Sequence, residues 1–395
     1  MLAVDRIDAD VAARDHRSMI PVMKPWLGPE ESEAAAAAVA SGWVAQGPKV
    51  GEFERAFSQL ISCGEAVAVS SCTAALHLAM VLLGLGPGDE VIVPSLSFIA
   101  TANAARYVGA TPVFADVDLE THNLTAESIE EVLSPATKAV IVVHQVGIPA
   151  DVDPIRDLMA QRGIALVEDA ACAIGSTYKG NMVGWDADLA TFSFHPRKLI
   201  TTGEGGMLTC ASAENATRAR RLREHGMSMS ASDRHRSGMA VIESYLETGY
   251  NYRMTDIQAA IGLVQLGRLE ELLIRRRALA ARYTESLADL GVIVASDPPY
   301  GTTNFQSYWI LLPADCPIER NELLARLLSD GISARRGVMA IHREPPFHGE
   351  PVPHLPVTEL LTENSLILPL YHELTEADQE FVIACLRRYL GASRN

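Results

Sequence analysis

The stretch with the clearest chemical potential surrounds Lys198 and covers residues 191–207, TFSFHPRKLITTGEGGM. An apolar, strand-like run ends at Ser193, Pro196 restricts the turn that follows, and a glycine-rich return leads into a second apolar run. A lysine held on such a turn, with apolar flanks and few nearby cations, loses its proton readily and attacks an aldehyde to form a Schiff base. An isolated lysine is more often a surface residue, here beside Arg197, so the rest of the chain must decide.

The scarcity of lysine narrows the choice. Of the 33 lysine and arginine residues, five are lysines, at positions 24, 49, 138, 179 and 198. Any Schiff-base lysine must be one of these five. Lys198 is the only one that lies in a glycine-rich turn, and we therefore select it as the candidate nucleophile.

An acidic residue at the end of an apolar run is the second candidate for a functional residue. Residues 164–167 predict a buried strand, and Glu168 and Asp169 follow it directly. A carboxylate at the end of a buried strand costs free energy unless a cation or a hydrogen-bond donor compensates it. Asp169 therefore requires a partner close by.

A possible phosphate site comes earlier in the chain. Residues 66–70 predict a short buried strand, and Ser71, Cys72 and Thr73 form a turn of small residues that opens an apolar helix. The free N–H groups and the positive dipole end of such a helix attract an anion, and the Thr73 hydroxyl adds a donor. An ordinary helix cap explains the same residues when they are considered alone.

The motif SFHPRK followed by TTGEGG resembles the cofactor-binding segment of the DegT/DnrJ/EryC1/StrS family of sugar aminotransferases, which are fold-type-I pyridoxal-phosphate (PLP) enzymes. Further family motifs appear in the expected order between residues 25 and 369, nearly the whole chain. The resemblance implies that Lys198 binds PLP as a Schiff base and carries protons between the substrate carbon and the cofactor. It also implies that Asp169 bonds the protonated pyridine nitrogen, which makes the ring an effective electron sink.

The resemblance assigns further residues to the cofactor. The phosphate would be bound by Cys72, Thr73 and Ser193; many relatives have Gly at the position of Cys72. Asn251 would reach the phosphate of the neighbouring subunit. Phe98 would lie against one face of the pyridine ring, as an apolar aromatic side chain can. Packing in the core is the alternative for Phe98, and a turn or cap is the alternative for Asn251.

Cys172 departs from the family pattern. Relatives commonly carry Gln or His at this position, near the phenolic oxygen of the cofactor, whereas a thiol is a weak hydrogen-bond donor. The departure leaves this cofactor contact open and bears on the type of substrate.

Two regions are candidates for substrate binding. Trp43 lies in a segment, GWVAQGPKV, that matches the family's N-terminal signature near the substrate entrance, and simple packing is the alternative. The loop ARRGVMAIHREPPF concentrates Arg335, Arg336, His342 and Arg343, which could meet phosphates or carboxylates. A solvated basic loop explains the second region equally well.

Alternation of apolar strands and helices predicts an α/β fold of PLP-dependent type I, with a mostly parallel sheet covered by helices and a smaller C-terminal α/β domain. We expect an N-terminal arm at 1–24, a large PLP-binding domain at 25–290 and a small domain at 291–395. The large domain would include one long connecting helix, from Asp256 to about Leu290. Residues 227–239, rich in Ser, Met and Arg, predict a loop.

Composition excludes several other classes of protein. The net charge of −16 disfavours nucleic-acid binding, which depends on Lys and Arg neutralising phosphates. The six cysteines form no CxxC pair and no metal-ligand spacing, which indicates reduced thiols, no metal and a cytoplasmic location. The N-terminus has no apolar signal region, and the longest apolar run, 74–85, is too short to span a membrane.

The function expected from these observations is transfer of an amino group from glutamate or glutamine to a nucleotide-linked keto deoxy sugar. The active unit would be a homodimer with shared active sites. A keto-cyclitol acceptor of an aminoglycoside-type pathway is the nearest alternative. A PLP sugar dehydratase is another, although those relatives replace the Schiff-base lysine with His and Lys198 is present here. A non-catalytic regulator is disfavoured by the intact set of cofactor residues.

Overall fold

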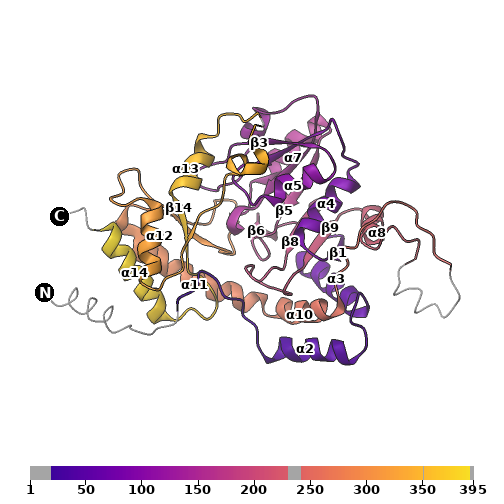
Figure 1. Cartoon of the computed structure of the whole chain (residues 1–395), viewed down its shortest axis with the longest axis horizontal. Coiled ribbons are helices and arrows are strands. Elements are labelled where there is room, and N and C mark those ends of the chain that lie inside the picture. The colour runs from indigo at the N-terminus through magenta and orange to yellow at the C-terminus, as the bar shows by residue number, and fades with distance from the viewer. Residues whose placement is uncertain (1–18, 230–241, 350, 392–395) are drawn as a thin grey trace.

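The computed structural model describes residues 19–229, 242–349 and 351–391. Most of the predicted loop 227–239 and residues 1–18 of the predicted arm lie outside these ranges. Within them the strands form three sheets flanked by helices (Figure 1).

The largest sheet has seven strands in the order β1-β9-β8-β5-β4-β2-β3. β9 runs antiparallel to both of its neighbours, and the other neighbouring pairs are parallel, so the prediction of a mostly parallel sheet is confirmed. Its strands are β1 (Glu65–Val69), β2 (Glu90–Pro94), β3 (Thr111–Ala115), β4 (Thr137–Val143), β5 (Ala165–Asp169), β8 (Leu189–Ser193) and β9 (Gly206–Cys210).

Helices cover both faces of this sheet (Figure 1). Because successive side chains of a strand point to opposite faces, Val91 and Val93 pack in one core cluster and Ile92 in another. Strands buried on both faces need apolar residues at nearly every position, which explains why their sequences do not alternate. The helices of this part are α2 (Pro29–Ala40), α3 (Pro48–Ile61), α4 (Cys72–Leu82), α5 (Ala100–Tyr107), α6 (Ala126–Glu130), α7 (Val152–Arg162), α8 (Ala213–Leu222) and the short η1 (Gln145–Gly147).

The expected long connecting helix has the predicted extent, from Asp256 to Leu290, but it is divided into two helices at one residue, Arg268. α10 (Asp256–Gly267) ends at Arg268, and α11 (Leu269–Leu287) begins there and continues into η2 (Ala288–Leu290). Gly267 weakens the helix at this point, and the Arg268 side chain is drawn toward two carboxylates of α2, those of Glu30 and Glu31. The ion pairs thus stabilise the break and hold α2 along α10 (Figure 1).

A second sheet has four antiparallel strands in the order β10-β12-β14-β13. Its strands are β10 (Ile293–Val294), β12 (Tyr308–Leu311), β13 (Arg335–Arg336) and β14 (Ser365–Leu368). The helices of this part of the chain are α12 (Arg320–Ser329), η3 (Ile341–Arg343), η4 (Pro345–Phe347), α13 (Pro356–Asn364) and α14 (Glu376–Leu390). A third, small sheet consists of β11 (Gly301–Thr302), β6 (Thr177–Tyr178) and β7 (Asn181–Met182).

The N-terminal residues of the described chain attach to the second sheet's region. Ile20 N–H donates to the carbonyl of Gly331, and Ser333 N–H donates back to the carbonyl of Ile20. The division into an arm, a large domain and a small domain remains our proposal. In the described part of the chain, no helix is long and apolar enough to cross a membrane.

Candidate active site

Neighbouring strands bring residues that are far apart in the sequence to one edge of the large sheet. Ser193 pairs with Gly206, and Gly206 pairs with Val69, so the three backbones lie in one row. Asp169, the last residue of β5, pairs with Thr191, two residues before Ser193. The predicted site residues therefore follow the carboxyl ends of β1, β5 and β8, where ligands bind in open α/β sheets.

The loop that carries Lys198 joins β8 to β9 and is held by its own backbone. Phe194 N–H donates to the carbonyl of Gly205 at 2.9 Å, and Thr202 N–H donates to the carbonyl of Phe194 at 3.0 Å. A side chain at Gly205 would not fit, because its Cβ would lie 2.3 Å from Thr202 Oγ1. The prediction of a constrained turn between two strands is confirmed.

The amine of Lys198 points toward a thiol and an acid. Its Nζ donates to Cys172 Sγ at 3.0 Å, and Asn304 Nδ2 fixes the Cys172 carbonyl at 2.8 Å. Burial alone lowers the pKa of Lys198, but Cys172, Cys72 and the Asp169 carboxyl outweigh burial, and the pKa lies above its ordinary value. The expectation of a readily lost proton is thus wrong for the protein groups alone, because acceptors rather than cations surround the amine.

Asp169 is buried, with 4% of its surface exposed. Thr101 Oγ1 donates to Oδ2 at 3.1 Å, and Ala171 N–H donates to Oδ1 at 3.1 Å. Burial raises the pKa of Asp169, although the Ala171 N–H, Lys198 and Thr101 act in the opposite direction. A carboxyl oriented in this way and short of positive charge suits a cationic ring nitrogen.

The N-terminus of α4 provides free backbone donors beside Gly206. Ser71 Oγ caps the helix by accepting from Ala74 N–H at 3.1 Å. The N–H groups of Cys72 and Thr73 have no acceptor within the described part of the chain. A Cβ at Gly206 would lie 2.4 Å from the Ser71 carbonyl carbon and 2.5 Å from the Cys72 nitrogen, so only Gly permits this close approach. The arrangement fits a phosphate group.

Phe98 precedes α5 and leaves 59% of its surface exposed, with no aromatic or cationic partner among the described residues. An exposed apolar ring near the ends of the parallel strands fits the face of a planar cofactor. The free N–H groups at α4, the Asp169 carboxyl, the Lys198 amine and the Phe98 ring together match the chemistry of PLP.

Asn251 and Trp43 lie nearer the margin of this region. Asn251 is exposed, its backbone pairs with Glu224, and its side chain makes no hydrogen bond within the described residues. Trp43 is partly buried against Gly47, where an added Cβ would lie 2.7 Å from the indole ring. The roles assigned to both residues remain predictions.

The four candidates of the basic loop do not form one cluster. His342 Nδ1 bonds with Ser95 Oγ at 2.7 Å, Arg336 pairs with Glu344 at 3.3 Å, and Arg343 pairs with Glu363 at 2.6 Å. The Arg335 side chain has no hydrogen bond or ion pair with any described residue. It lies instead on the same small cavity as Arg197.

Sequence reasoning missed several of these residues. Thr101, which holds Asp169, lies three residues after Phe98, and its spacing alone did not distinguish it from a core threonine. Arg197 had one usable signal, since it directly precedes Lys198. Gln306 and Asn304 lie in a segment that contains no recognisable motif. Their side chains reach distant segments, where Gln306 donates to the Arg197 carbonyl and Asn304 to the Cys172 carbonyl.

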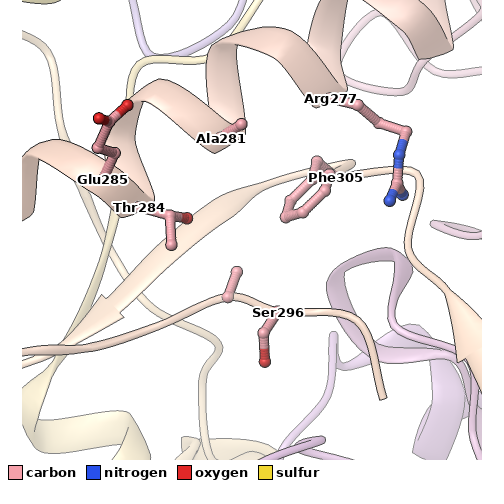
Figure 2. A pocket seen from close by; sticks show the side chains of 7 residues that line it. Arg277, Ala281, Thr284, Glu285, Ser296 and Phe305 are labelled. Carbon is pink, nitrogen blue, oxygen red and sulfur yellow. The ribbon is translucent and has the colours of Figure 1, made fainter. Parts of the chain in front are cut away.

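A larger cavity of ≈ 550 Å³ lies elsewhere, between α11 and the segment that contains Ser296 and Phe305 (Figure 2). Its basic side chain, Arg277, already pairs with Asp297 at 2.5 Å. None of the predicted site residues lines it. The chemistry of the molecule therefore lies at the sheet edge rather than in this larger cavity.

Comparison with solved structures shows proteins similar along almost the entire chain. The aminotransferase TlmJ from Streptoalloteichus hindustanus is 38% identical, with 95% of this chain and 99% of that chain covered and a TM-score of 0.87. DesV of S. venezuelae is 32% identical, with 96% and 100% covered and a TM-score of 0.86. The sugar aminotransferase Spr1654 of Streptococcus pneumoniae, solved in a PLP form, is 29% identical, with 95% and 99% covered and a TM-score of 0.88.

The model of the DegT/DnrJ/EryC1/StrS aminotransferase family matches residues 25–387. Spr1654 is also known in a form with pyridoxamine phosphate (PMP), the aminated state of the same cofactor. The fold, the free N–H groups at the start of α4, the Lys198 amine and the buried Asp169 carboxyl agree with that chemistry. The chain belongs to the DegT/DnrJ/EryC1/StrS aminotransferase family and is a PLP-dependent aminotransferase.

Proposed function

We propose that the enzyme transfers an amino group from glutamate or glutamine to the keto group of a nucleotide-linked deoxy sugar. The observation that carries this proposal is the strand register that brings Asp169 and the loop of Lys198 to one edge of the sheet, where Gly206 lies against the free donors of α4. The family and the similarity to Spr1654, a sugar aminotransferase, support a sugar as acceptor.

Each proposed residue has a distinct task. Lys198 Nζ holds the cofactor between turnovers and, once released, takes a proton from the donor carbon and returns one to the acceptor carbon. Bound PLP supplies the electron sink for the carbon that loses or gains the amino group. Asp169 keeps the ring nitrogen protonated, and Thr101 and Ala171 keep Asp169 in position.

The remaining cofactor contacts follow from the same placement. Cys72 and Thr73 donate their N–H groups to the phosphate, Ser193 adds its hydroxyl, and Phe98 covers one face of the ring. We further propose that the enzyme is a cytoplasmic homodimer and that Asn251, with its free and exposed side chain, completes the phosphate site of the partner subunit.

The substrate assignment is tested by incubating the PLP-loaded enzyme with a panel of nucleotide-linked keto sugars and cyclitol ketones. Glutamate and glutamine are supplied in separate reactions, and mass spectrometry detects the aminated product. We expect an amino sugar still attached to its nucleotide. Amination of the cyclitol ketones alone would replace the proposed substrate with the keto-cyclitol alternative.

A further inference from the structure

Two guanidinium groups beside the catalytic loop have no counter-charge. Arg197 directly precedes Lys198, and Arg335 lies on β13, the edge strand of the second sheet. Neither side chain forms a hydrogen bond or an ion pair within the described part of the chain. In a chain with 49 acidic residues, two unpaired arginines side by side require an explanation.

Both arginines line one cavity of ≈ 50 Å³. Met23, Leu368 and other apolar residues form part of its wall, which lowers the local dielectric and strengthens any charge pair formed there. Ligand pockets for whole small molecules measure roughly 300–1,000 Å³, so this cavity suits one small group of a ligand.

Gln306 provides a second, independent indication of a ligand. Its side chain is buried, with 8% exposed, and its Nε2 donates to the Arg197 carbonyl at 2.8 Å. Its Oε1 is buried and has no donor among the described residues, and Gln306 lines the same cavity as the two arginines. A buried amide oxygen without a donor destabilises the fold, and a bound N–H group would satisfy it.

The electrostatics favour an anion between the two arginines. Burial lowers the pKa of Arg335, and the like charges of Arg197 and Arg336 lower it further. Arg336 and Arg343 on the neighbouring segment are paired with Glu344 and Glu363. Arg335 therefore differs from these two neighbouring arginines, because no carboxylate of the described residues pairs with it.

We propose that Arg197 and Arg335 form the subsite that binds a carboxylate of the amino donor, with Gln306 Oε1 accepting the side-chain amide N–H when the donor is glutamine. Two guanidinium groups match a carboxylate in charge and geometry. The small cavity fits a carboxylate better than a nucleotide diphosphate, and one of its two arginines, Arg197, belongs to the loop that carries Lys198. This inference rests on the proposed function, since it assumes a dicarboxylic amino acid or its amide as donor.

The test separates the two half-reactions in Arg197→Gln and Arg335→Gln. The PLP-loaded protein is mixed with glutamate, and loss of the PLP absorbance reports the donor half-reaction. Calorimetry with 2-oxoglutarate measures binding to the same PLP-loaded form. Arg326→Gln is the matched control, because it removes an exposed, paired arginine from the same region of the chain. Thermal unfolding checks that each variant is folded.

We expect both variants to need about tenfold more glutamate or more for half-maximal rate, and to bind 2-oxoglutarate correspondingly more weakly. The reaction of the aminated enzyme with its keto acceptor should stay within twofold of wild type, as should every property of Arg326→Gln. Arg197→Gln and Arg335→Gln variants that behave like Arg326→Gln would overturn the proposed subsite.

A loss confined to the acceptor half-reaction would assign the two arginines to the acceptor and overturn their assignment to the donor. A wild-type enzyme that reacts with neither glutamate nor glutamine would refute the proposed donor, and the subsite with it.

Discussion

At the residue scale, Asp169 carries a buried charge with few compensating donors. Thr101 and Ala171 each contribute one hydrogen bond, which leaves the carboxyl able to stabilise a protonated ring nitrogen. Asp169→Asn should still bind PLP but lose about a hundredfold or more in transamination rate, since a neutral amide cannot keep that nitrogen protonated. Steady-state kinetics with absorbance-verified cofactor content measures this. Turnover close to wild type would make Asp169 a structural residue.

Cys172 affects the amine that must attach the cofactor. Its thiol accepts from Lys198 Nζ and raises the pKa of Lys198. Cys172→Ala should lower that pKa, so more of the amine is neutral at a given pH. The pH profile of the rate of PLP attachment to the cofactor-free protein should then shift to lower pH. Cys316→Ala is the control, and a profile that stays in place or moves to higher pH would contradict this role.

Much of the site was predictable from residue type and order, and the reason is local. Lys198 lies in a motif whose spacing requires a turn, and Asp169 follows an apolar strand, so each could be identified without knowing the fold. The Lys198–Cys172 contact and the proximity of Arg197 to Arg335 depend on how distant segments pack. The Cys172 contact raises the pKa of Lys198, and because it depends on packing between distant segments, the sequence alone did not predict the direction of that pKa.

At the element scale, the close approach of β9 to α4 shapes the phosphate cradle. Gly206→Ala would drive a methyl group into the Ser71–Cys72 backbone and displace the start of the helix. We expect the Kd for PLP to rise about tenfold or more, with a loss of roughly 1–3 kcal/mol in the free energy of unfolding. Fluorescence titration and denaturant unfolding measure the two effects.

Gly267→Ala serves as the control for this substitution. Gly267 ends α10 with no atom within 4 Å of an added Cβ, so alanine there should leave PLP binding unchanged. Equal PLP affinity in the two variants would show that the cradle does not depend on Gly206.

The strands and most helices followed from their apolar patterns, but the break between α10 and α11 did not. Residues 256–290 lack proline, and their two glycines, Gly262 and Gly267, are compatible with a continuous helix. The residue at the break, Arg268, pairs with Glu30 and Glu31, more than 230 residues earlier in the chain. Such contacts between distant elements cannot be read from local propensity, which alone does not place this helix boundary.

At the scale of the whole molecule, the proposed homodimer shares its sites between subunits. Lys198→Ala and Asn251→Ala should each be nearly inactive, but a mixed dimer would regain one site, formed by Lys198 of one chain and Asn251 of the other. Random mixing by co-refolding should restore roughly a quarter of wild-type activity. A mixture of Lys198→Ala with Asp169→Asn should restore nothing, since both residues come from the same subunit. Verified mixed dimers of the first pair that remain inactive would rule out sharing.

The central claim is that Lys198 holds the cofactor. Borohydride reduction of the PLP-loaded protein, followed by peptide mapping by mass spectrometry, tests it directly because reduction fixes the label on the lysine that carries it. Lys179→Ala, which removes an exposed lysine paired with Asp153, should retain the label, and Lys198→Ala should lose it. We expect one labelled peptide, containing Lys198. A label on Lys24, Lys49, Lys138 or Lys179 would contradict it.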